Sequence, residues 1–179
     1  MAFAAEPLPA KWHPGHYIYV DHGGLTPELL SLPHFQGLQK AVTWRTLEPE
    51  RNRYDFSSLR ADLAVAKKYH RQLVVQLTFK SFSKGVRNVP DYLRGEEFGG
   101  GVYRTLKGGF NPVLWNQRVA ERFEALIAAL GREFDRDPNL EAVNLPETAP
   151  NARLDVEPQA GVETYTEEVY VECLERFML

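Results

Sequence analysis

Apolar and polar positions follow a repeating order along this chain, in which short β-rich runs are separated by longer stretches with helical spacing. Runs of β-branched, aromatic and leucine side chains that end at turn-forming or polar residues predict strands over 16–20, 37–44, 72–79 and 140–145. Elsewhere apolar residues recur at steps of three and four. This spacing predicts helices over 57–70, from Asn111-Pro112 to 134, and over 165–178.

Strands that alternate with helices indicate a parallel sheet with right-handed crossovers. The predicted fold class is therefore α/β, either about four βα units of a TIM (β/α)8 barrel, which is a half barrel, or a small open sheet. The chain has 179 residues, whereas a full barrel typically needs about 250. We expect one domain over 1–179.

A half barrel leaves two edge strands with unpaired backbone groups and an uncovered apolar interior. We therefore expect a fragment, a half that pairs with itself, or an unusual open fold. A homodimer of two half barrels related by a two-fold axis would close a ring without open edges.

One long connection, 80–109, interrupts the regular pattern and contains two glycine groups. A loop of this length inside a compact domain is usually functional or disordered. The helix after it is predicted to begin at Asn111-Pro112, with the Asn as cap and the Pro in the first turn. Its buried face is marked by apolar residues at helical spacing, namely Val119, Phe123, Leu126, Leu130 and Phe134.

Composition excludes several function classes. The formal net charge of −3 provides no large cationic field, which argues against a nucleic-acid partner. No apolar run has the length of a membrane span, and the first ten residues lack the positive region of a signal peptide, so the location in the cell stays open. Cys173 is the only cysteine, and the five histidines have no metal-ligand spacing. We therefore expect no disulfide, no metal and no cofactor.

The segment from Trp44 to Phe56, W-R-T-L-E-P-E-R-N-R-Y-D-F, resembles the W-x-x-L-E-P-x-x-G-x-Y-D-F segment of retaining glycoside hydrolases with a (β/α)8 barrel, the β-galactosidase-like and cellulase-like clan. Val89-Pro-Asp-Tyr-Leu93 is similar to the P-x-W-L of the same enzymes. The resemblance covers residues 16–178, the first half of the family's barrel. It implies a hydrolase that acts on carbohydrate, with its general acid/base at the end of the fourth strand.

Glu147 follows the fourth predicted strand and is the candidate catalytic residue. In parallel barrels the chemistry lies at the carboxyl ends of the strands, and the resemblance places the family's proton donor here. The family usually has Asn-Glu in direct sequence, whereas Leu145-Pro146 separates Asn144 from Glu147 in this chain. The alternative for Glu147 is a solvated loop carboxylate or a cap for a following turn.

The remaining candidates are polar or aromatic groups at or near predicted strand ends, and each has a structural alternative. Arg45 would hold a carboxylate with two parallel hydrogen bonds as a functional residue, or it would form an ion pair that is only structural. Trp44 would stack on a sugar or pack in the core. Glu48 is expected to be structural, paired with Arg51 or Arg53. The predicted substrate-binding residues are Trp44, Arg45, His22, Gln76, Lys80 and Asn144.

These observations predict a protein like a glycoside hydrolase that acts on β-linked saccharides by acid/base catalysis at Glu147. Retaining hydrolysis needs a second carboxylate roughly 5–5.5 Å from the first, and the resemblance places it on a seventh strand that this chain lacks. The rival class is a non-catalytic carbohydrate-binding half barrel. A truncated scaffold without its own activity is the third interpretation.

Overall fold

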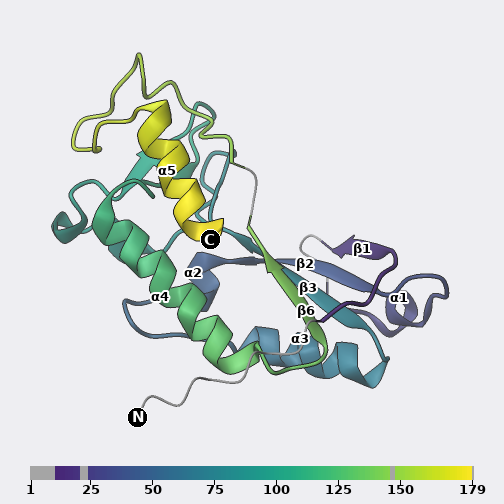
Figure 1. Ribbon diagram of the computed structural model, residues 1–179. Helices are drawn as coiled ribbons and strands as arrows, with labels where there is room; N and C mark the ends of the chain where they lie inside the picture. Colours follow the sequence, from purple (N-terminus) through teal and green to yellow (C-terminus); the bar gives the residue numbers. More distant parts are fainter. Residues whose placement is uncertain (1–10, 21–23, 146–147, 179) are drawn as a thin grey trace, which may run out of the picture. The chain divides into compact units, whose positions relative to one another are not determined.

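The computed structural model describes residues 11–20, 24–145 and 148–178 (Figure 1). His22 and Glu147 lie outside these ranges. The elements in chain order are β1 Tyr17–Val20, α1 Pro27–Ser31, β2 Gly37–Thr43, α2 Trp44–Leu47, α3 Ser57–Lys68, β3 Gln72–Thr78, the 3-10 turns η1 Asp91–Arg94 and η2 Glu96–Phe98, β4 Val102–Arg104, β5 Phe110–Pro112, α4 Gln117–Phe134, β6 Leu140–Asn144 and α5 Glu167–Met178.

The central feature is a four-stranded sheet in the order β1-β2-β3-β6. The pairs β1–β2 and β3–β6 are both parallel, which confirms the predicted α/β class. The order places β1 and β6 at the two edges, and the described residues do not close a barrel. This arrangement is compatible with part of a TIM barrel.

Internal contacts divide the chain into two compact units. The first takes the described residues up to Ala41, together with Ser57–Gln76 and Leu130–Asn144, and the second takes Val42–Phe56, Leu77–Ala129 and the described residues from Leu145 onward. The prediction of one domain therefore remains a prediction. None of the helices in the described ranges is long and apolar enough to cross a membrane.

In the first unit, α3 lies along one face of the sheet (Figure 1). Side chains of a strand alternate between faces. Lys40 of β2 reaches Asp62 of α3, with 2.5 Å between Nζ and Oδ2, so Lys40 faces the helix and its neighbour Gln39 faces the other side. Leu73 and Val75 of β3 are fully buried. The apolar side chains on the sheet face that points toward α3 therefore form the core between the sheet and this helix.

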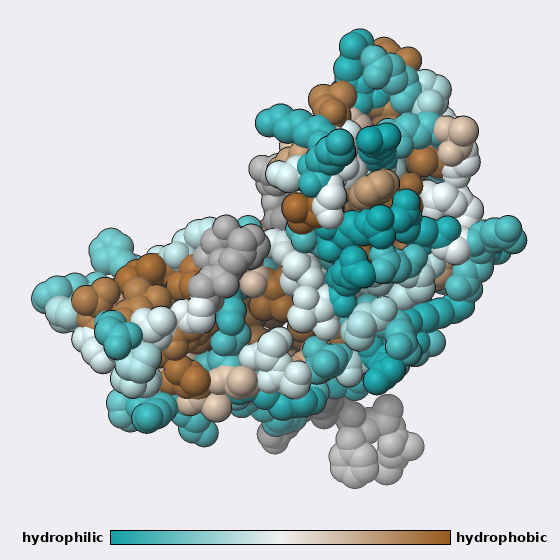
Figure 2. Space-filling view, turned by 180° about the vertical axis from the view of Figure 1, so that it is seen from behind, coloured by the Kyte–Doolittle hydropathy of each residue, from teal (hydrophilic) through white to brown (hydrophobic). Residues whose placement is uncertain are grey.

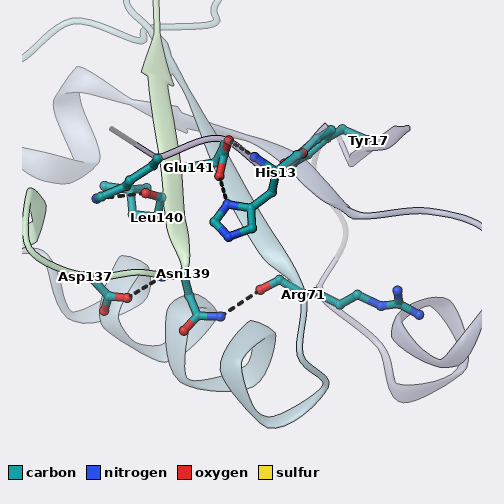
Figure 3. A network of polar contacts seen from close by, with 8 residues as sticks. His13, Tyr17, Arg71, Asp137, Asn139, Leu140 and Glu141 are labelled. Carbon is teal, nitrogen blue, oxygen red and sulfur yellow. Dashed lines mark hydrogen bonds and ion pairs between the residues drawn. The ribbon is translucent and has the colours of Figure 1, made fainter. Parts of the chain in front are cut away.

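Residues 11–17 form a strap that is bonded to the start of β6 (Figure 3). Lys11 Nζ donates to the Leu140 carbonyl at 3.0 Å. The backbone N–H of His13 donates to Glu141 Oε1 at 2.9 Å, and its Nδ1 lies 2.7 Å from Oε2. The register between β3 and β6 shifts at this point, where Leu73 pairs with Leu140 and the next residue pairs with Ala142. The bulge therefore presents the Glu141 carboxylate to the strap.

Apolar surface is left uncovered in the first unit. Figure 2 shows it in brown over the part that carries β1 and α1. Leu32, which directly follows α1 in the sequence, is 48% exposed. Tyr19 of the edge strand β1 is 53% exposed. Edge strands and bare sheet faces are the usual sites at which further chain is added.

The second unit contains the hairpin of β4 and β5, which are antiparallel, and a pair of packed helices. Phe123 of α4 and Phe177 of α5 meet edge to face with ring centroids 5.0 Å apart. Arg176 Nη1 donates to Gln117 Oε1 at 2.9 Å. Apolar residues at helical spacing thus pack α5 against α4, as their pattern predicts.

Two expectations about boundaries are wrong. Asn111-Pro112 does not open a helix, because both residues belong to β5. The helix begins at Gln117 instead, and Asn116 caps it, because its Oδ1 accepts from the N–H groups of Arg118 and Val119 at 3.1 and 3.2 Å. The expected buried stripe of this helix is confirmed over Val119, Phe123, Leu126, Leu130 and Phe134.

The second wrong expectation concerns the end of the second strand. The pattern predicts that it runs to Trp44, but β2 ends at Thr43 and α2 begins at once. Thr43 has an extended backbone, and its Oγ1 accepts from the N–H of Thr46 at 3.0 Å. This threonine is therefore the N-cap of a one-turn helix.

Candidate functional site

A row of polar side chains crosses the sheet face that points away from α3. Tyr19 of β1 is in register with Gln39 of β2, and Gln39 Nε2 donates to Gln76 Oε1 of β3 at 3.3 Å. Gln76 is in register with Asn144, the last residue of β6. We call these four residues the polar row; all of them belong to the first unit.

The polar row offers both donors and acceptors to a ligand. The Oδ1 atom of Asn144 is buried and has no hydrogen-bond partner among the described residues. A buried acceptor without a partner is uncommon. The exposed ring of Tyr19 lies at the other end of the row. Amide groups beside an aromatic ring are the kind of surface on which sugar hydroxyls are held.

The sequence identified Gln76 and Asn144 but missed Tyr19 and Gln39. Their signal is a polar or amphipathic side chain at one of the alternating positions of a strand. That signal becomes meaningful only once the register shows that all four face the same side.

Lys80 follows β3 and is held inside the second unit. It is 8% exposed, and its Nζ donates to the Ala149 carbonyl at 2.8 Å and to the Tyr170 hydroxyl at 2.7 Å. The Tyr170 hydroxyl in turn donates to the carbonyl of Thr148. Lys80 thus anchors the backbone at residues 148–149. Its expected contact with substrate remains a prediction.

Arg45, the second residue of α2, forms an ion pair. Its Nη2 donates to Asp91 Oδ2 at 2.6 Å, and Arg87 Nη1 approaches the other oxygen of Asp91 at 3.4 Å. The backbone N–H of Arg45 donates to the carbonyl of Asn88 at 2.9 Å. This is the ion-pair alternative that the sequence left open for Arg45, and the partner is a side chain of the protein.

Trp44 occupies a core position in the second unit. Its side chain is 0% exposed, its Nε1 donates to Glu48 Oε2 at 3.0 Å, and its ring meets Phe123 with centroids 5.1 Å apart. The sequence left both alternatives open for Trp44. In the structure its ring packs in the core.

Glu48 is fully buried and bonded on both oxygens. Oε1 accepts from the N–H of Asn52 at 2.9 Å and from Arg122 Nη2. The expected structural role agrees with these contacts, but the expected partner is wrong. Arg51 pairs with Glu97 and Arg53 with Glu50. Pairing with Arg122 is favoured because α4 brings that guanidinium into the same dry interior.

The guanidinium of Arg122 is the cation of this buried cluster. It is 9% exposed and donates to Asn52 Oδ1 at 2.7 Å and to the Tyr54 hydroxyl at 3.2 Å. Burial lowers the pKa of Arg122, but its interactions with Tyr92 and Glu48 outweigh burial and leave the pKa above its ordinary value. Burial also raises the pKa of Tyr92.

These contacts explain the motif that carries the family resemblance. Trp44, Glu48 and Tyr54 all belong to that motif, and each contacts the buried cluster around Arg122. The motif is therefore an internal framework that joins the end of β2 to α4. Trp44, Glu48 and Tyr54 of the motif therefore support the fold through buried contacts.

No family model matches the sequence, and no curated protein matches it either. Solved structures do resemble it. A GH5_18 protein of Bifidobacterium longum subsp. longum in complex with Manβ1-4GlcNAc has a TM-score of 0.56 at 13% identity, over 79% of this chain and 30% of that one. A GH5_18 protein of B. longum subsp. infantis has a TM-score of 0.55 at 13% identity, over 81% and 31%. An exo-β-1,4-mannosidase of the Opitutaceae bacterium strain TAV5 has 0.54 at 17%, over 89% and 28%.

The likeness shows a fold like that of glycoside hydrolases. It reaches across most of this chain, while the chain spans about 30% of the length of these solved structures. The fold of the described residues thus matches part of these structures.

Proposed function

We propose that this polypeptide is like a glycoside hydrolase in function, and that it acts on β-linked saccharides with Glu147 as its general acid/base. The observation that carries the proposal is the polar row. It crosses all four parallel strands and ends at Asn144, three residues before Glu147 in the sequence.

Two further observations support the proposal. The carbonyls of Thr148 and Ala149, directly after Glu147 in the sequence, are bonded to Tyr170 and Lys80. The backbone that follows the proposed acid in the sequence is therefore held by hydrogen bonds at residues 148 and 149. The related folds include a β-1,4-mannosidase and a protein in complex with Manβ1-4GlcNAc, so β-mannosides are the first substrates to test.

In the proposed reaction, the carboxylic acid of Glu147 gives its proton to the glycosidic oxygen while the bond from that oxygen to the anomeric carbon breaks. A second carboxylate attacks the anomeric carbon and forms a covalent intermediate. Glu147, now ionised, takes a proton from the incoming water, and the water oxygen displaces the second carboxylate. The proton lost in the first step leaves with the glycosidic oxygen, and the proton taken from water restores the acid form of Glu147.

The second carboxylate comes from outside these 179 residues in our proposal. A homodimer that completes the barrel is one source of further strands, because β1 and β6 are both edge strands and run parallel. Two copies of Glu147 in such a ring would lie half a ring apart, farther than the roughly 5–5.5 Å of a retaining pair. A homodimer is therefore expected to have weak or altered activity.

The test is hydrolysis of 4-nitrophenyl β-glycosides, starting with the β-mannoside, by the full chain and by Glu147→Gln. The matched control is Glu157→Gln, because Glu157 is an exposed carboxylate whose partner is Arg153, 3.2 Å away. We expect loss of turnover in Glu147→Gln and unchanged turnover in the control. Equal activity in all three proteins would refute the assignment of Glu147.

Light scattering during size-exclusion chromatography of the same sample tests the homodimer, which a monodisperse monomer would contradict. A further variant, Glu147→Ala, distinguishes an acid/base from a merely structural glutamate. With an activated dinitrophenyl leaving group, the first step needs little acid, and added azide replaces water in the second. Rescue by azide, with a β-glycosyl azide as product, is the expected result.

A non-catalytic carbohydrate-binding protein is the second candidate. The exposed ring of Tyr19 at the edge of the polar row favours it, because aromatic rings hold sugars without chemistry. In that case Glu147→Gln leaves the affinity for mannobiose unchanged, no turnover is measurable in any variant, and Tyr19→Ala weakens binding.

A further inference from the structure

A cavity of about 350 Å³ in the second unit is lined by side chains that the proposed reaction does not use. It lies between the turn after α2, the 3-10 turn η2 and the first turns of α4. Its lining contains guanidinium groups, carboxylates and one buried ring, namely Arg51, Glu97, Phe98, Arg118, Glu121 and Arg122. Small-molecule sites start at about this volume.

The three arginines differ in how firmly they are held. Arg122 is fixed at the back by Glu48, Asn52 and Tyr54, and its Nε has no hydrogen-bond partner among the described residues. A guanidinium that is nine-tenths buried and already ordered needs little further ordering to take part in binding.

Arg51 and Arg118 are the adaptable members of the lining. Arg51 pairs with Glu97 at the surface, where both side chains are half exposed, and such a pair contributes little stability and exchanges readily. Arg118 donates to the backbone carbonyl of Glu97 and has no carboxylate partner among the described residues. Its positive charge is therefore available to a ligand.

The lining contains three arginines and two glutamates. The charge of Arg122 is compensated by Glu48, so Arg51 and Arg118 provide the positive charge that a ligand would meet. Guanidinium groups match the oxygens of a phosphate with paired hydrogen bonds. Carboxylates such as Glu97 and Glu121 accept from hydroxyl groups. An anion that also carries several hydroxyls satisfies both sets of groups. A bare cation would pair with the carboxylates alone, and an apolar molecule satisfies neither set.

We propose that this cavity binds a phosphate monoester of a sugar, with the phosphate on Arg51 and Arg118 beside Arg122, and with the sugar hydroxyls on Glu97 and Glu121. The site goes beyond the proposed reaction, since it contains none of the residues of the polar row and is independent of Glu147.

The experiment is isothermal titration calorimetry of the full chain with glucose 6-phosphate, inorganic phosphate and glucose. We expect glucose 6-phosphate to bind most tightly, inorganic phosphate to bind more weakly, and glucose to show no binding. Arg118→Gln removes one charged hydrogen-bonding group from an exposed position, so we expect affinity to fall about tenfold. The control is Arg132→Gln, an exposed arginine of the same helix outside the cavity lining.

Three results would overturn the proposal: no binding of glucose 6-phosphate at millimolar concentration, equal affinity of wild type and Arg118→Gln, or glucose binding as tightly as its phosphate. Glu147→Gln is titrated in parallel and is expected to bind glucose 6-phosphate as the wild type does. Failure of the cavity proposal and failure of the proposed reaction are therefore separable.

Discussion

Replacing Arg122 by methionine tests the buried cluster most directly. Methionine has a similar length and can fill the space of the guanidinium stem, so the main change is the loss of a positive charge and its hydrogen bonds. Glu48, which is 0% exposed, then keeps its bonds from Trp44 and Asn52 but loses the cation. A buried carboxylate without a cation is poorly stabilised in a dry interior.

The magnitude follows from the type of contact. Removing one partner of a buried ion pair typically costs about 3–5 kcal/mol, because the other charge stays buried without compensation. A protein of this size loses about 2–4 °C of melting temperature per kcal/mol. We therefore expect Arg122→Met to lower the melting temperature by roughly 6–20 °C.

The assays are urea unfolding and thermal unfolding, both followed by circular dichroism. They give the change in free energy of unfolding and the change in melting temperature. Arg132→Met is the control, since it removes an exposed guanidinium from the same helix and should stay within about 0.5 kcal/mol of wild type. The double variant of Arg122→Met and Glu48→Gln removes both charges and should be more stable than the sum of the single changes predicts. A loss below about 1 kcal/mol, or strict additivity, would refute the reasoning.

Two further predictions concern a helix cap and a thiol. Asn116→Ala removes the cap of α4 and should lower the free energy of unfolding by about 1 kcal/mol in the same urea assay; an unchanged midpoint would show that the two bonds to Arg118 and Val119 contribute nothing. Burial raises the pKa of Cys173 to about 11, so the folded protein should react slowly with a disulfide reagent at pH 8 and quickly in urea. Because the folded pKa is above the unfolded one, the stability linked to this thiol is complete below the unfolded pKa and is lost as the pH rises through the folded pKa.

Local pattern was enough for much of the fold. The four parallel strands and the buried stripe of α4 lie close to where periodicity places them, since both depend on which residues along one element are apolar. The start of α4 was predicted wrongly, because Asn-Pro at 111–112 is a general signal for a helix start. Whether Asn111 and Pro112 join the β4–β5 hairpin depends on the residues of β4, which lie elsewhere in the chain.

The candidate site required more than local pattern. Gln76 and Asn144 could be proposed from their places at or near strand ends, as could Trp44 and Arg45 at the end of the second predicted strand. Alternation predicts that Gln39 and Lys40 point to opposite faces, but it does not say which face is covered by α3.

The sequence by itself determined the class of fold, the alternation of strands and helices, and the place of Glu147 after the fourth strand. Only the tertiary structure decided which side chains meet. The row from Tyr19 to Asn144 depends on the register of neighbouring strands, and Glu48 finds Arg122 rather than the nearby Arg51 or Arg53. The physical reason is that burial selects partners by position in space, and residues 74 positions apart in the chain become neighbours only when α4 packs onto the core.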